Sequence, residues 1–234
     1  MVRFFQVARA YAGAEVLVDV NLSIDKGELV VINGAAGSGK STLVRLLLGL
    51  EAPDRGWITV DGFTLAGASL AAHRRRLAVI PQGASLISDL TALRNVALSL
   101  EVAGASRLFA LRSAMEMLEQ LGIDRLSERL AGSLSSGEKQ WVTIARALVR
   151  EQAQLLIADE PSAHLDPGGA ELLARLLDER RRRGVTVIAT SQQTGLPGLV
   201  GQRVVMLDQG RVALDSAAMD SPSEIAGLAQ ARAS

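Results

Sequence analysis

The sequence predicts an α/β fold in which a mainly parallel β-sheet carries helices on both faces. Short β-branched strands alternate with helical patterns along much of the chain, as expected for parallel strands joined by helices. Strand-like pairs at the start of the chain and around Gly210 predict an antiparallel β edge. The strand pattern stops between about 84 and 134 and a helical pattern follows, which together predict an inserted helical lobe over about 84–150.

The strands are recognised by short β-branched runs, such as Leu29-Val30-Val31-Ile32. Strands are expected near 3–7, 16–24, 29–33, 57–60, 77–80, 154–158, 185–190, 203–208 and 211–214. The helices are recognised by apolar residues at helical spacing, such as Leu108, Leu111 and Met115. Helices are expected over 41–50, 106–121, 137–150 and 168–183. The tail at 216–234 is rich in Ala, Ser and Asp, and is expected to be frayed or weakly helical.

The composition excludes several classes of function. The chain has 234 residues, 48% of them hydrophobic, and a net charge of zero, so bulk electrostatics predict no nucleic-acid partner. It has no cysteine, which excludes disulfides, thiolate metal sites and a cysteine nucleophile. The first residues read as a strand rather than a signal peptide, and no run of about 18 apolar residues occurs. We therefore expect that the chain does not itself cross a membrane.

A glycine-rich loop lies between the strand at 29–33 and the helix that follows it. Three glycines allow the backbone to fold around an anion, and the helix start directs its positive dipole end at the same place. In this motif the lysine reaches the β- and γ-phosphates and the serine hydroxyl ligates Mg²⁺. A glycine-rich turn without a ligand is the alternative, but the flanking strand and helix favour a nucleoside triphosphate site. The candidate binding residues are Gly34, Ala35, Ala36, Gly37, Ser38, Gly39, Lys40, Ser41 and Thr42.

Two carboxylates follow the buried strand at 154–158. A carboxylate in this position lies at the edge of the sheet where α/β proteins bind ligands. Asp159 is the candidate for the Mg²⁺ shell, and Glu160 is the candidate general base that polarises the attacking water. The alternative is an acidic turn ended by Pro161, which the phosphate loop makes the weaker interpretation.

A third motif, Leu134-Ser135-Ser136-Gly137-Glu138, runs directly into the helix at 137–150. Serine and glycine at a helix start leave N–H groups that can bind an anion such as a γ-phosphate. An ordinary capping box, with Ser135 and Glu138 three residues apart, explains the same sequence motif without a binding function. In isolation the capping box is the better explanation.

Taken together, the motifs resemble those of the nucleotide-binding subunit of ABC transporters, a family with a P-loop NTPase core. The order of phosphate loop, Gln82, signature at 134–138 and Asp159-Glu160 is the order of that family, and the resemblance covers about residues 1–215. It implies one nucleotide-binding domain, with an α/β core at 1–83 and 151–215 and the helical lobe between. It also implies ATP and Mg²⁺ as ligands, and a cytoplasmic protein at the inner face of the membrane.

The resemblance implies further site residues. Tyr11 lies where an aromatic ring stacks on adenine, with a core aromatic as the alternative. Gln82 matches the glutamine that senses Mg²⁺ and links the core to the helical lobe. Asp166 matches the main carboxylate of a loop that crosses to the partner subunit. Two copies would sandwich two ATP molecules, each lying between one copy's phosphate loop and the residues Ser135, Ser136, Gly137 and Glu138 of the other.

The sequence departs from the family at three positions. The family places a histidine after the last core strand, where this chain has Gln192, whose amide cannot carry a proton as imidazole can. Ser136 stands in place of a glycine and Trp141 in place of an arginine. These departures predict a subunit that binds ATP well and hydrolyses it slowly.

Within the family, the N-terminal stretch and the segments 96–106 and 184–190 look most like the cell-division (FtsE) type, which implies an FtsX-like or other integral membrane permease. The lipoprotein-release (LolD) and macrolide-export (MacB) types are the nearest alternatives. A soluble ATP-dependent switch is a different class, supported by the missing histidine and opposed by Glu160. A small kinase or GTPase is a weaker alternative, because the chain has no Asn-Lys-X-Asp guanine motif.

Overall fold

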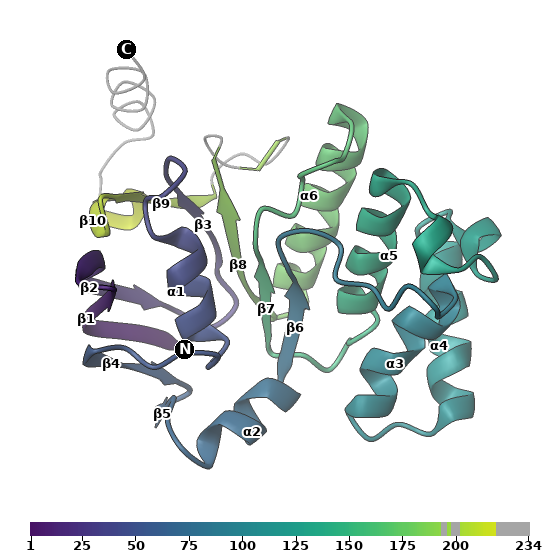
Figure 1. The fold of residues 1–234 in the computed structure, drawn as a ribbon, viewed down its shortest axis with the longest axis horizontal. Coiled ribbons are helices and arrows are strands. Elements are labelled where there is room, and N and C mark those ends of the chain that lie inside the picture. The colour runs from purple at the N-terminus through teal and green to yellow at the C-terminus, as the bar shows by residue number, and fades with distance from the viewer. Residues whose placement is uncertain (193–195, 198–201, 219–234) are drawn as a thin grey trace.

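The computed structural model describes residues 1–192, 196–197 and 202–218. Two β-sheets form its framework (Figure 1). The larger sheet has the strand order β10-β9-β3-β8-β7-β6, in which five strands are parallel and β10 pairs antiparallel with β9. Its strands are β3 (Leu29–Asn33), β6 (Leu77–Ile80), β7 (Leu155–Ala158), β8 (Thr186–Ser191), β9 (Arg203–Asp208) and β10 (Arg211–Asp215).

The second sheet is antiparallel and has the order β2-β1-β4-β5. Its strands are β1 (Val2–Tyr11), β2 (Ala14–Ile24), β4 (Arg55–Val60) and β5 (Phe63–Thr64). The predicted antiparallel pair at the start of the chain therefore belongs to a separate sheet, which is completed by β4. The hairpin predicted around Gly210 is present, and Gln209 and Gly210 have φ values of 45° and 76°, as a tight two-residue hairpin turn requires.

Six α-helices and three 3-10 turns occur in the described part of the chain. The helices are α1 (Lys40–Leu47), α2 (Ser69–Arg75), α3 (Ala92–Val102), α4 (Arg107–Gln120), α5 (Ser136–Leu148) and α6 (Pro167–Arg182), and the turns are η1 (Asp124–Leu126), η2 (Ala131–Ser133) and η3 (Ser216–Ala218). The four predicted helices agree with α1, α4, α5 and α6 to within a few residues. Of the predicted tail, 219–234 lies outside the described residues. None of the described helices is both long and apolar enough to span a bilayer.

Alternate residues of the central strands face two separate cores. Val30 and Ile32 of β3 pack with α1 and the antiparallel sheet, whereas Leu29 and Val31 pack toward α5 and α6. The strands β7 and β8 divide their side chains in the same way. This two-residue period explains why the strands are apolar throughout, because both faces of a helix-covered parallel sheet are buried.

The helical lobe lies beside the core and is formed by α3 and α4, which pack against α5 (Figure 1). Serine and threonine caps define where these helices begin. The hydroxyl of Thr91 accepts a hydrogen bond from the N–H of Arg94, and that of Ser106 accepts one from the N–H of Phe109. The fold class expected from the sequence, an α/β core with an antiparallel edge and an inserted helical lobe, is thus confirmed.

The helix α2, like α3, has no counterpart among the four helix ranges expected from the sequence. In the structure His73 is buried, and its Nε2 lies 2.8 Å from the carbonyl oxygen of Leu47 at the end of α1. Burial lowers the pKa of His73, which favours the neutral ring. This side chain therefore joins α2 to α1 and is remote from the phosphate loop.

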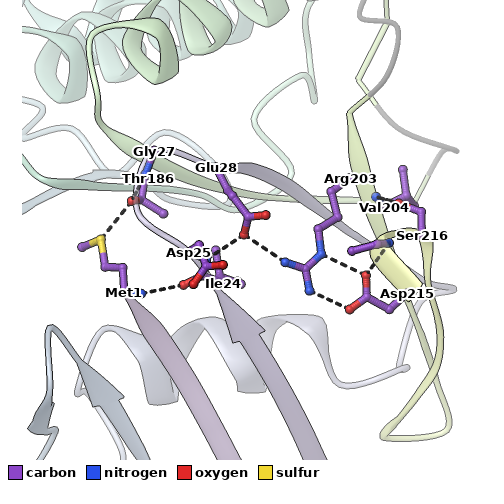
Figure 2. A network of polar contacts seen from close by, with 11 residues as sticks. Met1, Ile24, Asp25, Gly27, Glu28, Thr186, Arg203, Val204, Asp215 and Ser216 are labelled. Carbon is purple, nitrogen blue, oxygen red and sulfur yellow. Dashed lines mark hydrogen bonds and ion pairs between the residues drawn. The ribbon is translucent and has the colours of Figure 1, made fainter. Parts of the chain in front are cut away.

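Arg203 at the start of β9 links the end of β10 to the residue before β3 (Figure 2). Its guanidinium binds the Asp215 carboxylate through two N–H groups, at 2.9 and 2.6 Å, and the Glu28 carboxylate at 2.9 Å. Burial opposes the ionisation of Asp215, but hydrogen bonds from Arg203 and from the N–H of Ala217 outweigh it and lower the pKa of Asp215. The network thus holds β10 against the beginning of β3.

Replacing Arg203 with methionine is expected to lower the free energy of unfolding at pH 7 by about 1–3 kcal/mol, because two partly buried carboxylates lose their partner. The folded pKa of Asp215 lies below its unfolded value of about 3.9, so its contribution is complete above that value and is lost as the pH falls. Denaturant unfolding should therefore separate the variant from wild type at pH 7 and much less near pH 3. The exposed Arg211→Met is the control and should match wild type at both pH values.

Candidate functional site

The candidate site lies at one edge of the larger sheet, where the parallel strands end. β3 leads into the phosphate loop, β6 into Pro81-Gln82, β7 into Asp159-Glu160 and β8 into Gln192. Because parallel strands present the same end at the same edge, four segments distant in sequence converge there. The fold thus brings together the site residues that the sequence predicts in these four segments.

The phosphate loop has the open backbone that an anion site needs. Gly37 and Gly39 have φ values of 80° and 106°, which side chains rarely allow. A Cβ atom at Gly34 would lie 2.3 Å from the carbonyl oxygen of Leu207, so the loop also packs too closely for a larger residue. Ala35, Ala36 and Gly37 are exposed at the tip. The loop therefore presents its backbone to solvent while its base is fixed.

The base of the loop is also fixed by the β9–β10 hairpin. The N–H of Gly210 donates to the carbonyl oxygen of Ser38 at 3.1 Å, and its own carbonyl accepts from the N–H of Val18 at 2.8 Å. A Cβ atom at Gly210 would lie 2.3 Å from the carbonyl oxygen of Val16. The loop is consequently held between β2 and a hairpin near the other end of the described chain.

Lys40 begins α1 and is nearly enclosed, with 4% of its surface exposed. Its Nζ donates to the carbonyl oxygens of Gly34 and Ala35 at 2.7 and 2.9 Å. Burial lowers the pKa of Lys40, while the charges of Glu160 and Asp159 act in the opposite direction. The ammonium group is thus buried, and it donates hydrogen bonds to two neutral carbonyls. An anion in the loop would be a stronger partner for it.

Asp159 is also buried, with 7% of its surface exposed. Its Oδ1 accepts a hydrogen bond of 2.6 Å from the hydroxyl of Thr190. Burial raises the pKa of Asp159, and the bond from Thr190 and the charges of Lys40 and Arg45 counteract that rise. The carboxylate is held in place between β7 and β8.

Glu160 lies between two glutamines. The Nε2 of Gln192 is 2.8 and 2.9 Å from the two carboxylate oxygens, and the Nε2 of Gln82 is 3.4 Å from one of them. The backbone of Glu160 has a φ of 46°, in the left-handed region. The two predicted catalytic residues, Glu160 and Gln192, are therefore in direct contact, and Gln82 reaches the same carboxylate.

Lys40, Glu160 and the two glutamines line a cleft of about 260 Å³, whereas the buried Asp159 does not. Its lining consists of Val16, Ala36, Gly37, Gly39, Lys40, Ser41, Thr42, Arg45, Gln82, Glu160 and Gln192. Arg45 and Val16 are not among the site residues that the sequence motifs predict. Arg45 lies one helical turn after Ser41 on α1, so the helix period contained a signal for it. Val16 lies in another sheet, and no local pattern indicates it.

The residues present fit a Mg²⁺–nucleotide better than a metal held by protein alone. Among the described residues no three His, Cys, Asp or Glu side chains cluster as a metal site. Ser41, Gln82 and Asp159 supply oxygen donors of the kind that Mg²⁺ accepts when phosphates complete its shell. The Ser38 hydroxyl is buried without a hydrogen-bond partner in the described part of the chain, so the loop also contains an unsatisfied polar atom.

Tyr11 does not line this cleft. Its hydroxyl donates to the carboxylate of Glu51, and the guanidinium carbons of Arg9 and Arg45 lie 4.9 and 5.9 Å from its ring centroid. Arg45 is also an ion-pair partner of Glu51 at 3.2 Å and lines the cleft, so it connects Tyr11 to the site. Stacking of Tyr11 on adenine stays a prediction.

The signature residues also lie outside the cleft lining. Ser135 and Glu138 form the capping box of α5: the Ser135 hydroxyl accepts from the N–H of Glu138, and the Glu138 carboxylate accepts from the N–H of Ser135 at 2.9 Å. Arg129 and Arg125 contact the same carboxylate at 3.0 and 3.4 Å. The capping explanation therefore accounts for the local geometry, and contact of this segment with phosphate stays a prediction.

Asp166 likewise has a local role. Its carboxylate caps α6 by accepting a hydrogen bond of 2.8 Å from the N–H of Gly169. Its loop lies against the signature, because a Cβ atom at Gly137 would be 3.4 Å from the carbonyl oxygen of His164. The two segments expected to meet a partner subunit are thus neighbours on one surface.

Comparison with protein families identifies the larger group. The model of the family described as ABC transporter matches residues 17–163, a range that contains the phosphate loop, Gln82, the signature and Asp159-Glu160. The chain belongs to this family. The family suggested by the motifs is therefore confirmed.

Methionine import ATP-binding proteins, MetN, are among the curated proteins that are most similar to this chain. Those of Rhizobium johnstonii and Caulobacter vibrioides are each 37% identical, over 216 and 223 residues. They match 91% and 93% of this chain, which covers 59% and 67% of their own lengths. The chain thus spans about three fifths to two thirds of these relatives. Their names do not support the predicted cell-division subtype.

Solved ABC cassettes share the fold. The ATP-binding cassette MJ0796, in a dimeric post-hydrolysis state with bound ADP and Pi, superposes with a TM-score of 0.84 at 30% identity, covering 92% of this chain and 97% of that one. An ATP-binding subunit of an ABC transporter superposes with a TM-score of 0.83 at 27% identity, covering 100% and 95%. The arrangement of sheet, loops and helical lobe is therefore that of ABC cassettes.

Proposed function

We propose that this chain is the ATP-binding and ATP-hydrolysing subunit of an ABC transporter-type complex, which dimerises on ATP and drives a separate membrane permease. The observation that carries the proposal is the cleft, where Lys40, Ser41, Gln82, Glu160 and Gln192 meet. One buried cation, a serine hydroxyl and a carboxylate at the rim of a glycine loop are the parts needed to bind and hydrolyse a nucleoside triphosphate.

Each residue has a role in this proposal. Lys40 binds the β- and γ-phosphates in place of its present carbonyl partners. Ser41, Gln82 and Asp159 hold Mg²⁺, which neutralises phosphate charge when bound. Glu160 accepts a proton from the attacking water, and its contact with Gln192 orients the carboxylate. The glycine loop and the start of α1 direct backbone N–H groups at the phosphates.

Dimerisation follows from the position of the signature. Ser135, Ser136, Gly137 and Glu138 do not line the chain's own cleft. In this proposal they complete the cleft of a second copy, with Asp166 on the neighbouring loop. A solved dimer of the similar cassette MJ0796 supports this arrangement. ATP would then join two chains, and its hydrolysis would let them separate.

Gln192→His is expected to raise steady-state ATP turnover several-fold, because an imidazole can exchange protons with the site and the amide cannot. The affinity for ATP should change little. The measurement is ATPase activity of purified wild type and variant at saturating Mg-ATP. Equal rates would remove Gln192 as the cause of slow turnover. Gln120→His, at the end of α4 on the lobe, is the matched control for introducing a histidine elsewhere.

A groove between the core and the helical lobe is the proposed contact surface for the permease, and the lobe contributes Leu98, Ser99 and Val102 to it. It has a volume of about 430 Å³ and lies between the end of α1, β6 and α3. Leu50 and Val102 at its rim are 61% and 77% exposed, unusually high for large apolar side chains. Arg74, Arg146 and Arg150 add positive charge to its walls. An amphipathic helix with an acidic end would suit it.

The names of the relatives make a methionine importer the first candidate for the complex. The cell-division type with an FtsX-like permease, the lipoprotein-release and export types, and a soluble slow-turnover switch are the other candidates from the sequence. These candidates differ in the partner of the ATP-binding subunit, whereas the nucleotide cleft would be the same in all of them.

The identity of the partner can be tested by affinity purification of tagged Glu160→Gln protein from its native membranes in detergent with Mg-ATP, followed by mass spectrometry. A stoichiometric multi-pass protein would support a transporter-type ATPase, and its identity would separate methionine import from cell division and export. Recovery of the homodimer alone would favour the soluble switch. The parallel sample of Lys40→Ala protein should recover no ATP-dependent partner.

A further inference from the structure

Thr190, near the end of β8, connects the two carboxylates of the site. Its side chain is fully buried. The hydroxyl donates to Asp159 Oδ1 at 2.6 Å and accepts from the backbone N–H of Glu160 at 2.9 Å. One hydroxyl thus uses its single donor and one acceptor on two adjacent residues of the neighbouring strand end.

The segment that Thr190 holds is strained. Glu160 has a φ of 46°, in a region that non-glycine residues adopt only when their surroundings impose it. The hydrogen bond to Thr190 fixes the N–H on one side of this residue. On the other side, the carbonyl oxygen of Pro161 accepts from the buried Nε2 of Gln140 at 2.8 Å. The orientation of the Glu160 side chain therefore depends on the hydrogen bonds that Thr190 and Gln140 make with the backbone on either side of it.

The same hydroxyl fixes the other carboxylate. The carboxyl group of Asp159 is buried, among the charged groups Lys40, Arg45 and Glu160. A hydrogen bond to a buried carboxylate both stabilises the charge and selects one rotamer. With Oδ1 held by Thr190, the carboxylate has a defined orientation toward the rest of the site. Valine has nearly the same shape as threonine but could make neither bond.

We propose that Thr190 is a positioning residue, whose hydroxyl holds Asp159 in the orientation that binds Mg²⁺ and Glu160 in the orientation that accepts the proton of water. This inference rests on the proposed ATPase function and assigns it a residue that is fully buried and does not line the cleft. It gives the buried hydroxyl of Thr190 a role at the end of β8, next to both carboxylates.

The test compares Thr190→Val with Thr190→Ser. In Thr190→Val, the Mg²⁺ concentration for half-maximal ATPase activity should rise about 10-fold, and the kcat should fall about 10-fold or more, as expected for losing a buried hydrogen bond to a charged group. Mn²⁺ binding to the ADP complex, followed by electron paramagnetic resonance, should weaken to a similar degree. Binding of ATP without metal should change less than about 2-fold. Thr190→Ser keeps the hydroxyl and should stay within about 3-fold of wild type in every measurement.

Other outcomes would overturn the inference. Wild-type Mg²⁺ dependence in Thr190→Val would show that the hydroxyl has no positioning role. A loss in Thr190→Ser as large as that in Thr190→Val would show that keeping the hydroxyl does not preserve activity, and would refute the positioning role. If Thr190→Val does not fold, Thr190→Cys, a weaker donor, should give an intermediate loss, and wild-type behaviour there would refute the role. A wild-type protein that neither binds nor hydrolyses ATP would refute the proposed function itself.

Discussion

Lys40→Ala is expected to lower the affinity for ATP by about 100-fold or more, because the phosphates lose their main buried counter-charge. The Nζ of Lys40 is enclosed by the loop, bonded to the carbonyl oxygens of Gly34 and Ala35. Isothermal titration calorimetry with ATP in the absence and presence of Mg²⁺ measures the loss.

Two further variants separate charge from loop shape. Lys40→Met keeps most of the side-chain length without the charge and should lose affinity like alanine. Lys26→Ala removes an exposed lysine before β3 and should bind ATP like wild type. Thermal unfolding without nucleotide shows whether each variant is folded. Wild-type affinity in folded Lys40→Ala protein would contradict the assignment of the cleft as the nucleotide site.

Glu160→Gln is expected to reduce ATP turnover by about 100-fold to 10,000-fold, the range for losing a general base, while binding is kept. The amide is nearly the same size as the carboxylate, and its oxygen can still accept a hydrogen bond from Nε2 of Gln192. Without hydrolysis, the ATP-bound dimer should persist. Sedimentation velocity with Mg-ATP should then show a stable dimer for this variant and mostly monomer for wild type.

The matched control is Glu179→Gln, an exposed carboxylate on α6 that is remote from the cleft lining. It should retain wild-type turnover and show no persistent dimer. The double variant Lys40→Ala, Glu160→Gln should stay monomeric with ATP, because dimer formation depends on bound nucleotide. A Glu160→Gln protein that is monomeric at saturating Mg-ATP would count against the two-copy sandwich.

Much of the fold could be predicted because its signals are local. A buried parallel strand is apolar on both faces, and the runs at 29–33 and 154–158 have that pattern. The helices α4, α5 and α6 begin with side-chain caps and carry clear apolar stripes. In contrast, α2 spans seven residues and ends in arginines, so its pattern is too short to distinguish from a loop.

The candidate site was predictable to the extent that it is made of short motifs. Lys40, Asp159 and Glu160 are recognised by the strand before them, and the sheet then brings them together. Arg45 and Thr190 were not predicted as site residues, because their place in the site depends on contacts between elements rather than on neighbours in sequence. The cell-division subtype was inferred from the N-terminal stretch and the segments 96–106 and 184–190, most of which lie in strands and a helix whose apolar residues are shaped by packing.

The hairpin at Gly210 has a consequence for how the protein acquires its activity. The base of the phosphate loop is bonded through Ser38 to a turn that is made only after nearly all of the described chain has left the ribosome. A nascent chain can form the strand and helix around the glycines much earlier, but it lacks this support. Because such distant contacts form late, capture of nucleotide should be among the last events of folding. Cellular ATP would then stabilise only chains that have completed the core.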